Sequence, residues 1–195
     1  MELALFPLKT VLLPGNTLQL KIFEPRYTDM IAGCMRDQKP FGIVLIHQGE
    51  ETDSEVEIFT TGTTAMVSDW EKRPDGLLGI TIRGEDRFEV VSTRVLDNGL
   101  LIAEVRLLDD GGDVPVPEQY SYMQELLVHI SGQRKAEIPQ LDFCAIVYRL
   151  IYLLPLDNTL KQQLLEVPDC MERAVVLHAE LIRLGVIQYV KPEKG

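Results

Sequence analysis

The chain has 195 residues, enough for one large domain or two small ones, and its 46% hydrophobic and 25% charged composition is typical of a globular protein. It carries 19 Lys and Arg against 30 Asp and Glu, which gives a formal net charge of −11. Contacts to a phosphate backbone or to an anionic lipid surface depend on Lys and Arg, so this balance disfavours nucleic acid and membranes as partners.

Residues 1–108 are predicted to form mostly short strands. Leu18, Leu20 and Ile22 alternate with polar neighbours, as in a strand with one buried face. Residues 41–47 are rich in branched apolar side chains, which is typical of a strand buried on both faces. We expect the strands to pair as a meander and to close into a small β-barrel, because closure leaves no exposed edge.

One helix is predicted to interrupt these strands early. Pro25 suits the first position of a helix, where its missing N–H would have no partner in any case. Apolar residues then recur at helical spacing, which places one face of this helix on the sheet. These residues are Tyr27, Met30, Ile31, Cys34 and Met35.

Two turn sequences divide the later strands. Gly76 follows Pro-Asp and Gly99 follows Asp-Asn, and glycine at such positions tolerates the left-handed backbone of hairpin turns. Both turns therefore predict antiparallel hairpins. The strands expected around them cover residues 62–73, 77–83, 87–96 and 100–107.

A linker is predicted over residues 109–117, and the period of the apolar residues becomes helical beyond it. One helix ends before Pro155, which lacks the N–H that a helix interior needs. A short helix is expected over 158–166. Asp169, with a glutamate three residues later, has the pattern of a capping box that opens the last helix, and Gly185 would end that helix.

The predicted fold class is therefore α+β. A β-rich barrel subdomain would cover residues 1–108, and a C-terminal helical bundle would cover residues 118–190.

The three cysteines are Cys34, Cys144 and Cys170. Their odd number and wide spacing argue against a disulfide framework and favour a reduced, cytoplasmic protein. The start of the chain also lacks the basic and apolar regions of a secretory signal. Cys34 lies on the apolar face of the first predicted helix, so we expect a buried, inert thiol there.

Several stretches of the sequence, taken in order, carry a family resemblance. The first is residues 5–30, LFPLKTVLLPGNTLQLKIFEPRYTDM, and a later one contains a G-x-x-R-F signature. Together they resemble the Lon N-terminal domain family, the substrate-binding region that precedes the ATPase of Lon proteases. The matching stretches are 5–30, 41–45, 62–67, 76–90, 153–156 and 161–166, within an overall span of about residues 3–184.

The resemblance implies a PUA-like β-barrel followed by a helical bundle, and a role in holding unfolded or client polypeptides. The family domain also occurs in cereblon, joined there to a ligand-binding domain that nothing here resembles. The sequence holds no P-loop, whose glycines and lysine cradle phosphates, and no protease domain. We therefore expect a stand-alone, non-catalytic member without cofactors, which would need a separate protease or chaperone as a further partner to serve degradation.

The residues of the family motifs are predicted to be structural, with ligand contact as the alternative. Partly buried arginines are usually paired, so Arg87 or Arg26 would bind a carboxylate such as Glu24 where strand and helix meet, with Tyr27 packed on the barrel. In particular, we expect Arg87 to pair with an acid near the helix start. The motif residues are Pro14, Gly15, Phe23, Glu24, Arg26, Tyr27, Gly84, Arg87 and Phe88.

Trp70 is the candidate contact for a polypeptide. It lies among charged residues close to a predicted turn, and an exposed tryptophan is a common binding anchor. Cover by the helical part of the chain is the equal alternative. The histidines His47, His129 and His178 have no second ligand at metal spacing, so no metal ligand and no catalytic residue is predicted.

Three functions compete at this point. The leading one is a non-catalytic polypeptide-binding module, which could act as an adaptor or chaperone-like binder. The alternative is an RNA-binding protein, because PUA-like barrels also occur in that class, although the net charge disfavours it. A small hydrolase is the third, and the sequence offers no clustered His, Cys or Ser motif for it. An apolar groove would favour the first, and a basic groove the second.

Overall fold

The computed structural model describes residues 1–51, 56–112, 114–132 and 141–188. The strands are β1 Glu2–Leu8, β2 Thr17–Ile22, β3 Phe41–Gln48, β4 Glu57–Lys72, β5 Leu78–Val95 and β6 Leu101–Leu108. The helices are α1 Pro25–Asp37, α2 Tyr122–Ser131, α3 Phe143–Leu153, α4 Asn158–Glu166 and α5 Cys170–Arg183, with a short 3₁₀ turn at Glu118–Tyr120. The predicted α+β class is thus confirmed. Within the described ranges, no helix has the length and apolar character needed to cross a bilayer.

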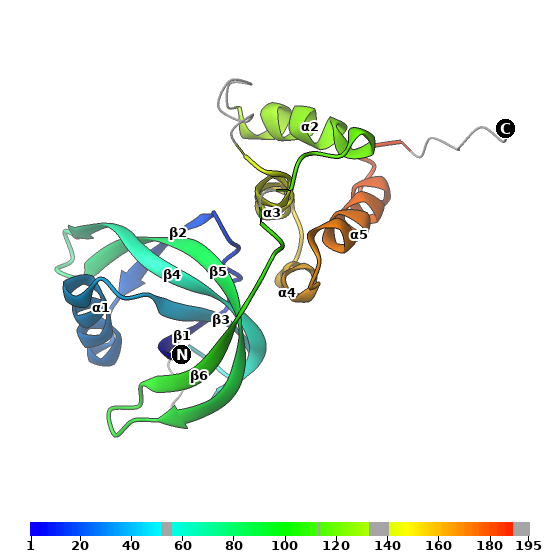
Figure 1. Cartoon of the computed structure of the whole chain (residues 1–195). Helices are drawn as coiled ribbons and strands as arrows, with labels where there is room; N and C mark the ends of the chain where they lie inside the picture. The colour runs from blue at the N-terminus through cyan, green and yellow to red at the C-terminus, as the bar shows by residue number, and fades with distance from the viewer. Residues whose placement is uncertain (52–55, 113, 133–140, 189–195) are drawn as a thin grey trace, which may run out of the picture.

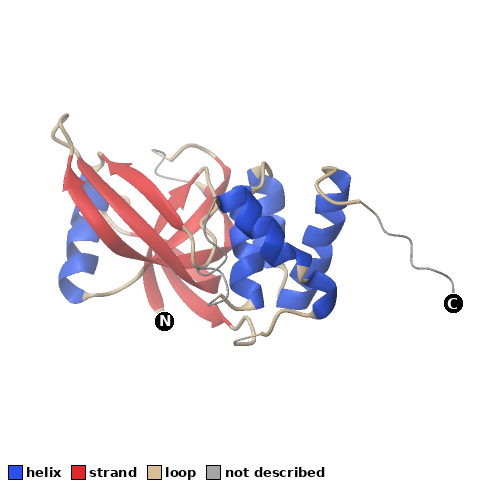
Figure 2. Cartoon of the chain, turned by 90° about the horizontal axis from the view of Figure 1, so that it is seen from above, coloured by secondary structure: helices blue, strands red, loops and turns tan. Residues whose placement is uncertain are grey.

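The strands form one sheet in the order β2-β5-β4-β3-β1-β6, and β6 pairs with β5 as well, so the ladder of strands returns to β5. β1 and β3 are parallel, and the other pairs are antiparallel. Figure 1 shows α1 alone on one side of the sheet. The C-terminal helices, α2 to α5, lie together at the other side (Figure 2). Sheet and C-terminal helices therefore meet along one junction.

The long strand β5 differs from the prediction of two strands, 77–83 and 87–96. The strand continues through the expected break and only its pairing partner changes there. Arg83 pairs with β2, whereas Arg87 pairs with β6. Gly84 lies between these two segments. Its N–H donates to the Asn16 carbonyl, and the Gly15 N–H donates to the Gly84 carbonyl, both at 2.9 Å. The apparent break in the sequence is therefore a crossing point for the backbone.

Substitution of Gly84 tests this close approach. A Cβ atom at Gly84 would lie 2.6 Å from the Leu13 carbonyl oxygen, which is backbone and cannot move aside freely. We expect Gly84→Ala to lower the free energy of unfolding by about 1–3 kcal/mol. Gly33→Ala is the matched control, because Gly33 lies within α1 and a Cβ atom there would lie 4.0 Å from Arg36 Nη2, an ordinary contact distance. This control should stabilise the protein by about 0.5–1 kcal/mol. Urea unfolding measures both, and a Gly84→Ala protein as stable as wild type would contradict the interpretation.

A small apolar core inside the ladder of strands surrounds Phe88. The ring is fully buried, and two glycines on β3 and β4 make room for it. A Cβ atom at Gly42 or at Gly62 would lie 2.8 Å or 2.6 Å from the ring. The other buried members of this cluster are Leu3, Leu5, Val44, Ala103 and Val105. The signature phenylalanine thus fills space that two missing side chains leave open.

A second apolar cluster lies between the sheet and α1. The ring of Tyr27 stacks on Phe6, with 4.0 Å between the ring centroids, and Met30 and Ile31 from the next turn are buried beside it. Pro25 takes the first position of α1, as the sequence predicts. The apolar stripe therefore holds α1 on the sheet.

The C-terminal helices share the largest apolar cluster, which also includes Val11, Leu13 and Leu45 from the strand region. Their ends follow the predicted signals. α3 ends at Leu153, before the proline, and Asp169 caps α5 by accepting hydrogen bonds from two backbone N–H groups, at 2.8 and 3.0 Å.

The prediction about the cysteines is wrong, because Cys144 and Cys170 form a disulfide. They are 26 residues apart in sequence, yet α3 and α5 pack against each other and bring the two Cα atoms to 5.6 Å. Spacing along the chain carries no information about this packing. The third cysteine, Cys34, is free and only partly buried on α1, packed against the cluster beneath that helix.

Candidate functional site at the junction of sheet and helices

Asp110, within the predicted linker, is the centre of the junction. Its Oδ1 atom binds Arg87 Nη2 at 2.6 Å and Arg173 Nη2 at 3.0 Å, and its Oδ2 atom accepts a hydrogen bond from the Tyr148 hydroxyl at 2.8 Å. Both arginines are buried, with 1% and 0% of the side chain exposed. We call these four residues the Asp110 hub. It joins β5, α3 and α5 through one carboxylate.

The partner of Arg87 corrects the sequence prediction. Arg87 was expected to pair with an acid near the start of the first helix, but it pairs with Asp110 at the other side of the sheet. Glu24 instead binds Arg26, with 2.9 Å between Oε2 and Nη2. Arg26 also donates to the Gly99 carbonyl at 2.7 Å. The position along β5 explains this difference. The β5 residues that pack in the cluster beneath α1, such as Ile80 and Ile82, precede Gly84, whereas Arg87 follows it, where β5 pairs with β6.

The two arginines also close the C-terminal end of α4. The last carbonyl groups of a helix have no partner within it, and cations are favourable there. Arg87 donates to the carbonyls of Leu165, Val167 and Pro168 at 2.9, 3.1 and 2.9 Å. Arg173 donates to the Leu164 carbonyl at 2.9 Å and the Val167 carbonyl at 2.7 Å. The helix is thereby tied to the sheet.

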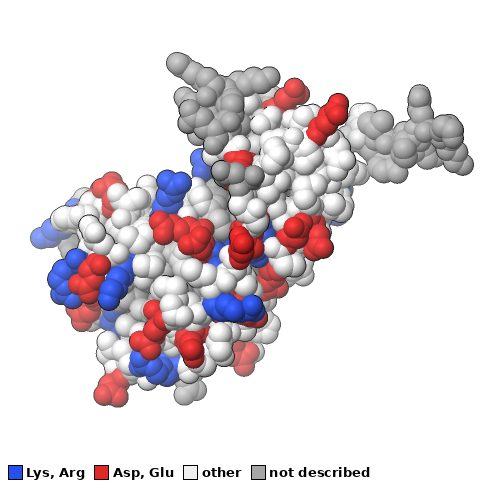
Figure 3. All heavy atoms as spheres, in the orientation of Figure 1, with Lys and Arg blue, Asp and Glu red and all other residues white. Residues whose placement is uncertain are grey.

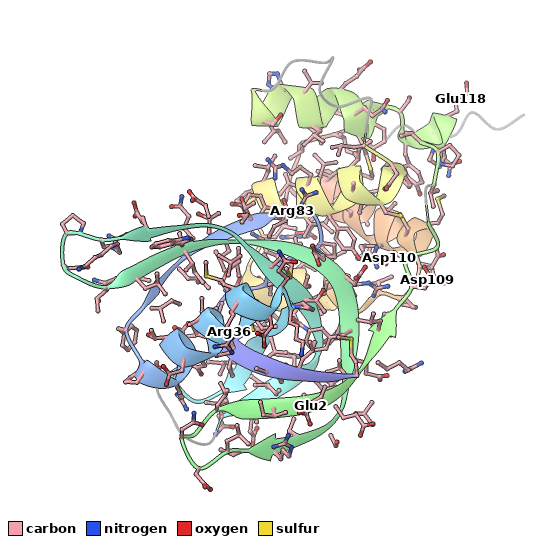
Figure 4. All side chains as sticks on the ribbon, turned by 60° about the vertical axis from the view of Figure 1, so that its left-hand side comes forward. Glu2, Arg36, Arg83, Asp109, Asp110 and Glu118 are labelled. Atoms are coloured by element: carbon pink, nitrogen blue, oxygen red, sulfur yellow. A yellow bond between two sulfur atoms is a disulfide. The ribbon has the colours of Figure 1, made fainter. Side chains whose placement is uncertain are left out.

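A cleft of about 470 Å³ opens beside the hub. Its apolar lining includes Pro14, Leu107, Leu108 and Ala145, and Cys144 and Tyr148 line it as well. Every charged residue that lines it is an acid: Asp86, Asp109, Asp110 and Asp142. We call it the junction cleft. Figure 4 shows Asp109 and Asp110 on the segment that leaves β6 towards the helices, and Figure 3 shows acidic side chains gathered where helices and sheet meet.

Burial raises the pKa of three tyrosines. The pKa of Tyr148 lies well above its usual range, mainly through desolvation, with Arg173 opposing the shift. Desolvation raises the pKa of Tyr122 to about 12, and it also raises that of Tyr27. A raised pKa in the folded state means that the unfolded chain loses its phenolic protons first. The stabilisation is complete below pH about 10 and is lost as the pH rises through the folded pKa values.

We therefore expect stability to fall steeply between pH about 10 and pH about 12. Tyr148→Phe should be less stable near neutral pH, because Asp110 loses a donor, but its alkaline fall should be shallower. Tyr152→Phe, a change at an exposed ring of α3, is the control. Thermal unfolding followed against pH measures the effect. An equally steep alkaline fall in Tyr148→Phe and wild type would contradict it.

Trp70 lies in the last part of β4 and does not line the junction cleft. Its side chain is 59% exposed, so the alternative of cover by the C-terminal helices is wrong. On the sheet it lies opposite Ile80 of β5, which in turn lies opposite Leu20 of β2. A shallow hollow of about 140 Å³ beside Trp70 includes both of these residues. The candidate contact is thus accessible, but Ile80 is buried and the hollow is lined mainly by polar side chains.

The sequence-predicted motif residues separate into two groups in the structure. Gly15 and Pro14 line the junction cleft, whereas Phe23, which is 56% exposed, directly follows β2 and precedes α1.

Among the described residues, no group of three or more His, Cys, Asp and Glu side chains has an arrangement that could hold a metal ion. One of the three histidines, His178, forms a hydrogen bond with a tyrosine: its Nδ1 atom lies 2.6 Å from the Tyr122 hydroxyl oxygen.

Asp110, Tyr148 and Arg173 are the members of the Asp110 hub that the sequence prediction missed. Asp110 has the composition of a linker around it, and Arg173 lies in a helix where an arginine is usually exposed. One signal for Arg173 was its position on the apolar face of its helix, three residues after the buried Cys170 and four before the buried Leu177.

Comparison with known proteins identifies the class to which this arrangement belongs. Residues 2–183 match the model of the ATP-dependent protease La (LON) substrate-binding domain. The chain belongs to this family. The crystal structure of a Lon N-terminal domain protein from Xanthomonas campestris superposes with a TM-score of 0.79 at 32% identity, covering 92% of this chain and 98% of that one.

More distant relatives share the fold or part of the sequence. The N-terminal domain of a Mycobacterium avium complex Lon protease has a TM-score of 0.65 at 17% identity, over 97% of this chain and all of that one. The Lon protease of Amoebophilus asiaticus is 26% identical over 89% of this chain, and cereblon of Xenopus tropicalis is 26% identical over 52%. This chain spans 22% of the length of each of these two relatives.

Proposed function

We propose that the protein is a non-catalytic module that binds unfolded or client polypeptide segments in the junction cleft. The observation that carries the proposal is the cleft itself, which combines an apolar lining with an acidic one in a member of a substrate-binding family. A volume of about 470 Å³ suits a few side chains of an extended segment. The cleft therefore fits a short stretch of chain rather than a folded partner.

The chemistry of the lining defines the segment that fits best. Leu107, Leu108 and Pro14 offer apolar contact, which supplies about 25 cal/mol for each Å² buried, before the entropic cost of ordering the segment. Asp86 and Asp109 favour Lys or Arg next to the apolar side chains, and they repel phosphate. This lining argues against the RNA-binding alternative at this site, where a basic groove would be needed.

Trp70 is proposed as a second, independent contact. It is the most exposed large aromatic side chain in the described part of the chain, and it lies opposite the buried Ile80 of β5, beside a hollow lined mainly by polar side chains. A segment that reaches Trp70 would make apolar contact with the indole ring, with polar and charged side chains around it. Because the two surfaces are separate, a long unfolded chain could occupy both.

Finer features of the fold are also part of this proposal. We infer that the closed ladder of strands is the PUA-like barrel and that the C-terminal helices form a bundle. The protein would then have two subdomains, the barrel over residues 1–108 and the bundle over residues 118–190. Residues 133–140, 189 and 190 of the second range lie outside the described residues. A cytoplasmic adaptor that presents clients to a separate protease or chaperone is the role that suits such a module.

Titration with a reduced, unfolded model protein tests the proposal. Binding should persist between about 50 mM and about 500 mM salt, because most of the affinity is apolar and charge pairs beyond a Debye length are screened. Asp86→Lys should weaken binding about tenfold at low salt, and Trp70→Ala about fivefold at both. Asp29→Lys, a change at an exposed residue of α1, is the control.

The same samples should leave ATP and the model protein intact. Binding that collapses at high salt, or that occurs only with RNA, would overturn the proposal in favour of the charge-driven alternative. Equal binding by all variants would remove the junction cleft and Trp70 as the contact surfaces.

A further inference from the structure

The disulfide lies directly beside the Asp110 hub. Cys144 is in the first turn of α3 and lines the junction cleft, whereas Cys170 is the first residue of α5. Both side chains are buried. The bond therefore joins the starts of the two helices that supply the hub with Tyr148 and Arg173, and one of its two cysteines, Cys144, lines the cleft.

Each cysteine lies on the same helix face as a member of the hub. Tyr148 follows Cys144 by four residues, and Arg173 follows Cys170 by three, which places each pair one helical turn apart on one side of its helix. The two hub residues contact each other: the Arg173 guanidinium lies 4.4 Å from the centroid of the Tyr148 ring. The distance between the helix starts thus sets the contact between Tyr148, Arg173 and Asp110.

We propose that Cys144 and Cys170 form a reversible redox switch that controls the shape of the junction cleft. In the disulfide form the starts of α3 and α5 are held together and the hub is closed. In the dithiol form two unbonded sulfur atoms need more room, so the two first turns separate and loosen the Tyr148 and Arg173 contacts to Asp110. Asp110 and its neighbour Asp109, both in the lining, then gain freedom to move.

The chemistry is thiol–disulfide exchange. A thiolate of a small dithiol attacks one sulfur of the Cys144–Cys170 bond, and a mixed disulfide forms as that bond breaks. The second thiolate of the reagent then displaces the remaining cysteine. Two electrons and two protons pass to the cysteines, and the reagent becomes a cyclic disulfide. A small oxidised disulfide, such as that of glutathione, reverses the reaction.

Hydrogen exchange without any client tests this switch. Mass spectrometry of the unreduced protein should find a peptide pair linked through Cys144 and Cys170, and one free thiol, Cys34. Reduction with a dithiol should speed amide exchange roughly tenfold in residues 107–112 and 141–148, with no change in α1. Oxidation with glutathione disulfide should restore the slow exchange.

Two variants separate the switch from a general effect of the reagent. Cys144→Ser should exchange fast in these segments with or without the dithiol, and Cys34→Ser should respond as wild type does. Equal exchange in oxidised and reduced wild-type protein, or no linked peptide pair, would overturn the inference, even if Cys144→Ser fails to fold. So would a response that survives in Cys144→Ser.

The consequence for binding rests on the proposed function. If the junction cleft holds polypeptide, affinity for the unfolded model protein should differ about fivefold or more between the two redox states. A switch seen by hydrogen exchange without this difference would leave the inference standing and remove the junction cleft as the polypeptide site.

Discussion

Arg87→Ala is expected to lower the free energy of unfolding by about 3–5 kcal/mol, which for a chain of this size corresponds to a fall in Tm of roughly 10 °C. The change removes the donor for the carbonyls of Leu165, Val167 and Pro168. It also leaves Asp110 with one guanidinium in place of two. Buried groups that lose their partner pay the full cost of desolvation, so the effect exceeds that of an ordinary hydrogen bond.

Two further variants sharpen this prediction. Arg87→Lys should recover little, because one ammonium group cannot replace the flat fork that reaches three carbonyls and a carboxylate. Arg106→Ala is the matched control: Arg106 lies on the neighbouring strand β6 and pairs with Glu89, but at the surface. It should cost less than about 1 kcal/mol. Urea unfolding distinguishes these cases. Equal losses of unfolding free energy in Arg87→Ala and Arg106→Ala would show that the hub stabilises the protein no more than a surface ion pair does.

Phe88→Ala is expected to lower the free energy of unfolding by about 3–5 kcal/mol. Truncation leaves a cavity inside the ladder of strands, and the cost of such a cavity depends on how well its walls can collapse. Here Gly42 and Gly62 face the ring and have no side chain that could move in. Backbone held in a closed ladder is rigid, so we expect the upper part of this range.

The control for this prediction is Phe23→Ala. Phe23 belongs to the same family motifs, but its side chain is 56% exposed, so its loss should change stability by no more than about 0.5 kcal/mol. Thermal unfolding of both variants provides the measurement. A Phe23→Ala protein that unfolds as early as Phe88→Ala would mean that burial does not separate their roles.

Local patterns were sufficient for most of the helices and strands. Pro25, Asp169 and Pro155 act within one or two turns of their own position, and the structure has the helix boundaries that they predict. The alternation of Leu18, Leu20 and Ile22 likewise corresponds to β2. Such signals depend only on neighbours along the chain, so a sequence displays them directly.

The junction could not be predicted in this way. Asp110 meets Arg87 from 23 residues earlier in the chain and Arg173 from 63 residues later, and no periodicity records which strand crosses to which side. The disulfide has the same origin, since it depends on how α3 packs against α5. The central residue of the candidate site therefore lies in a stretch that the sequence predicts to be a linker. Trp70, which the sequence singles out as a candidate contact, does not belong to this site.

The contacts of Arg87 with the C-terminal end of α4 have a consequence for how the protein folds and unfolds. They join residues about 80 positions apart, so α4 can be completed only after β5 has formed and the chain has returned to it. A high mean sequence separation of contacts slows folding. It also makes the last step cooperative, because the carbonyl groups of Leu165, Val167 and Pro168 lack their Arg87 partner until β5 has formed. Cutting the protein between β6 and the helices should therefore yield two unstable fragments rather than two independent folding units.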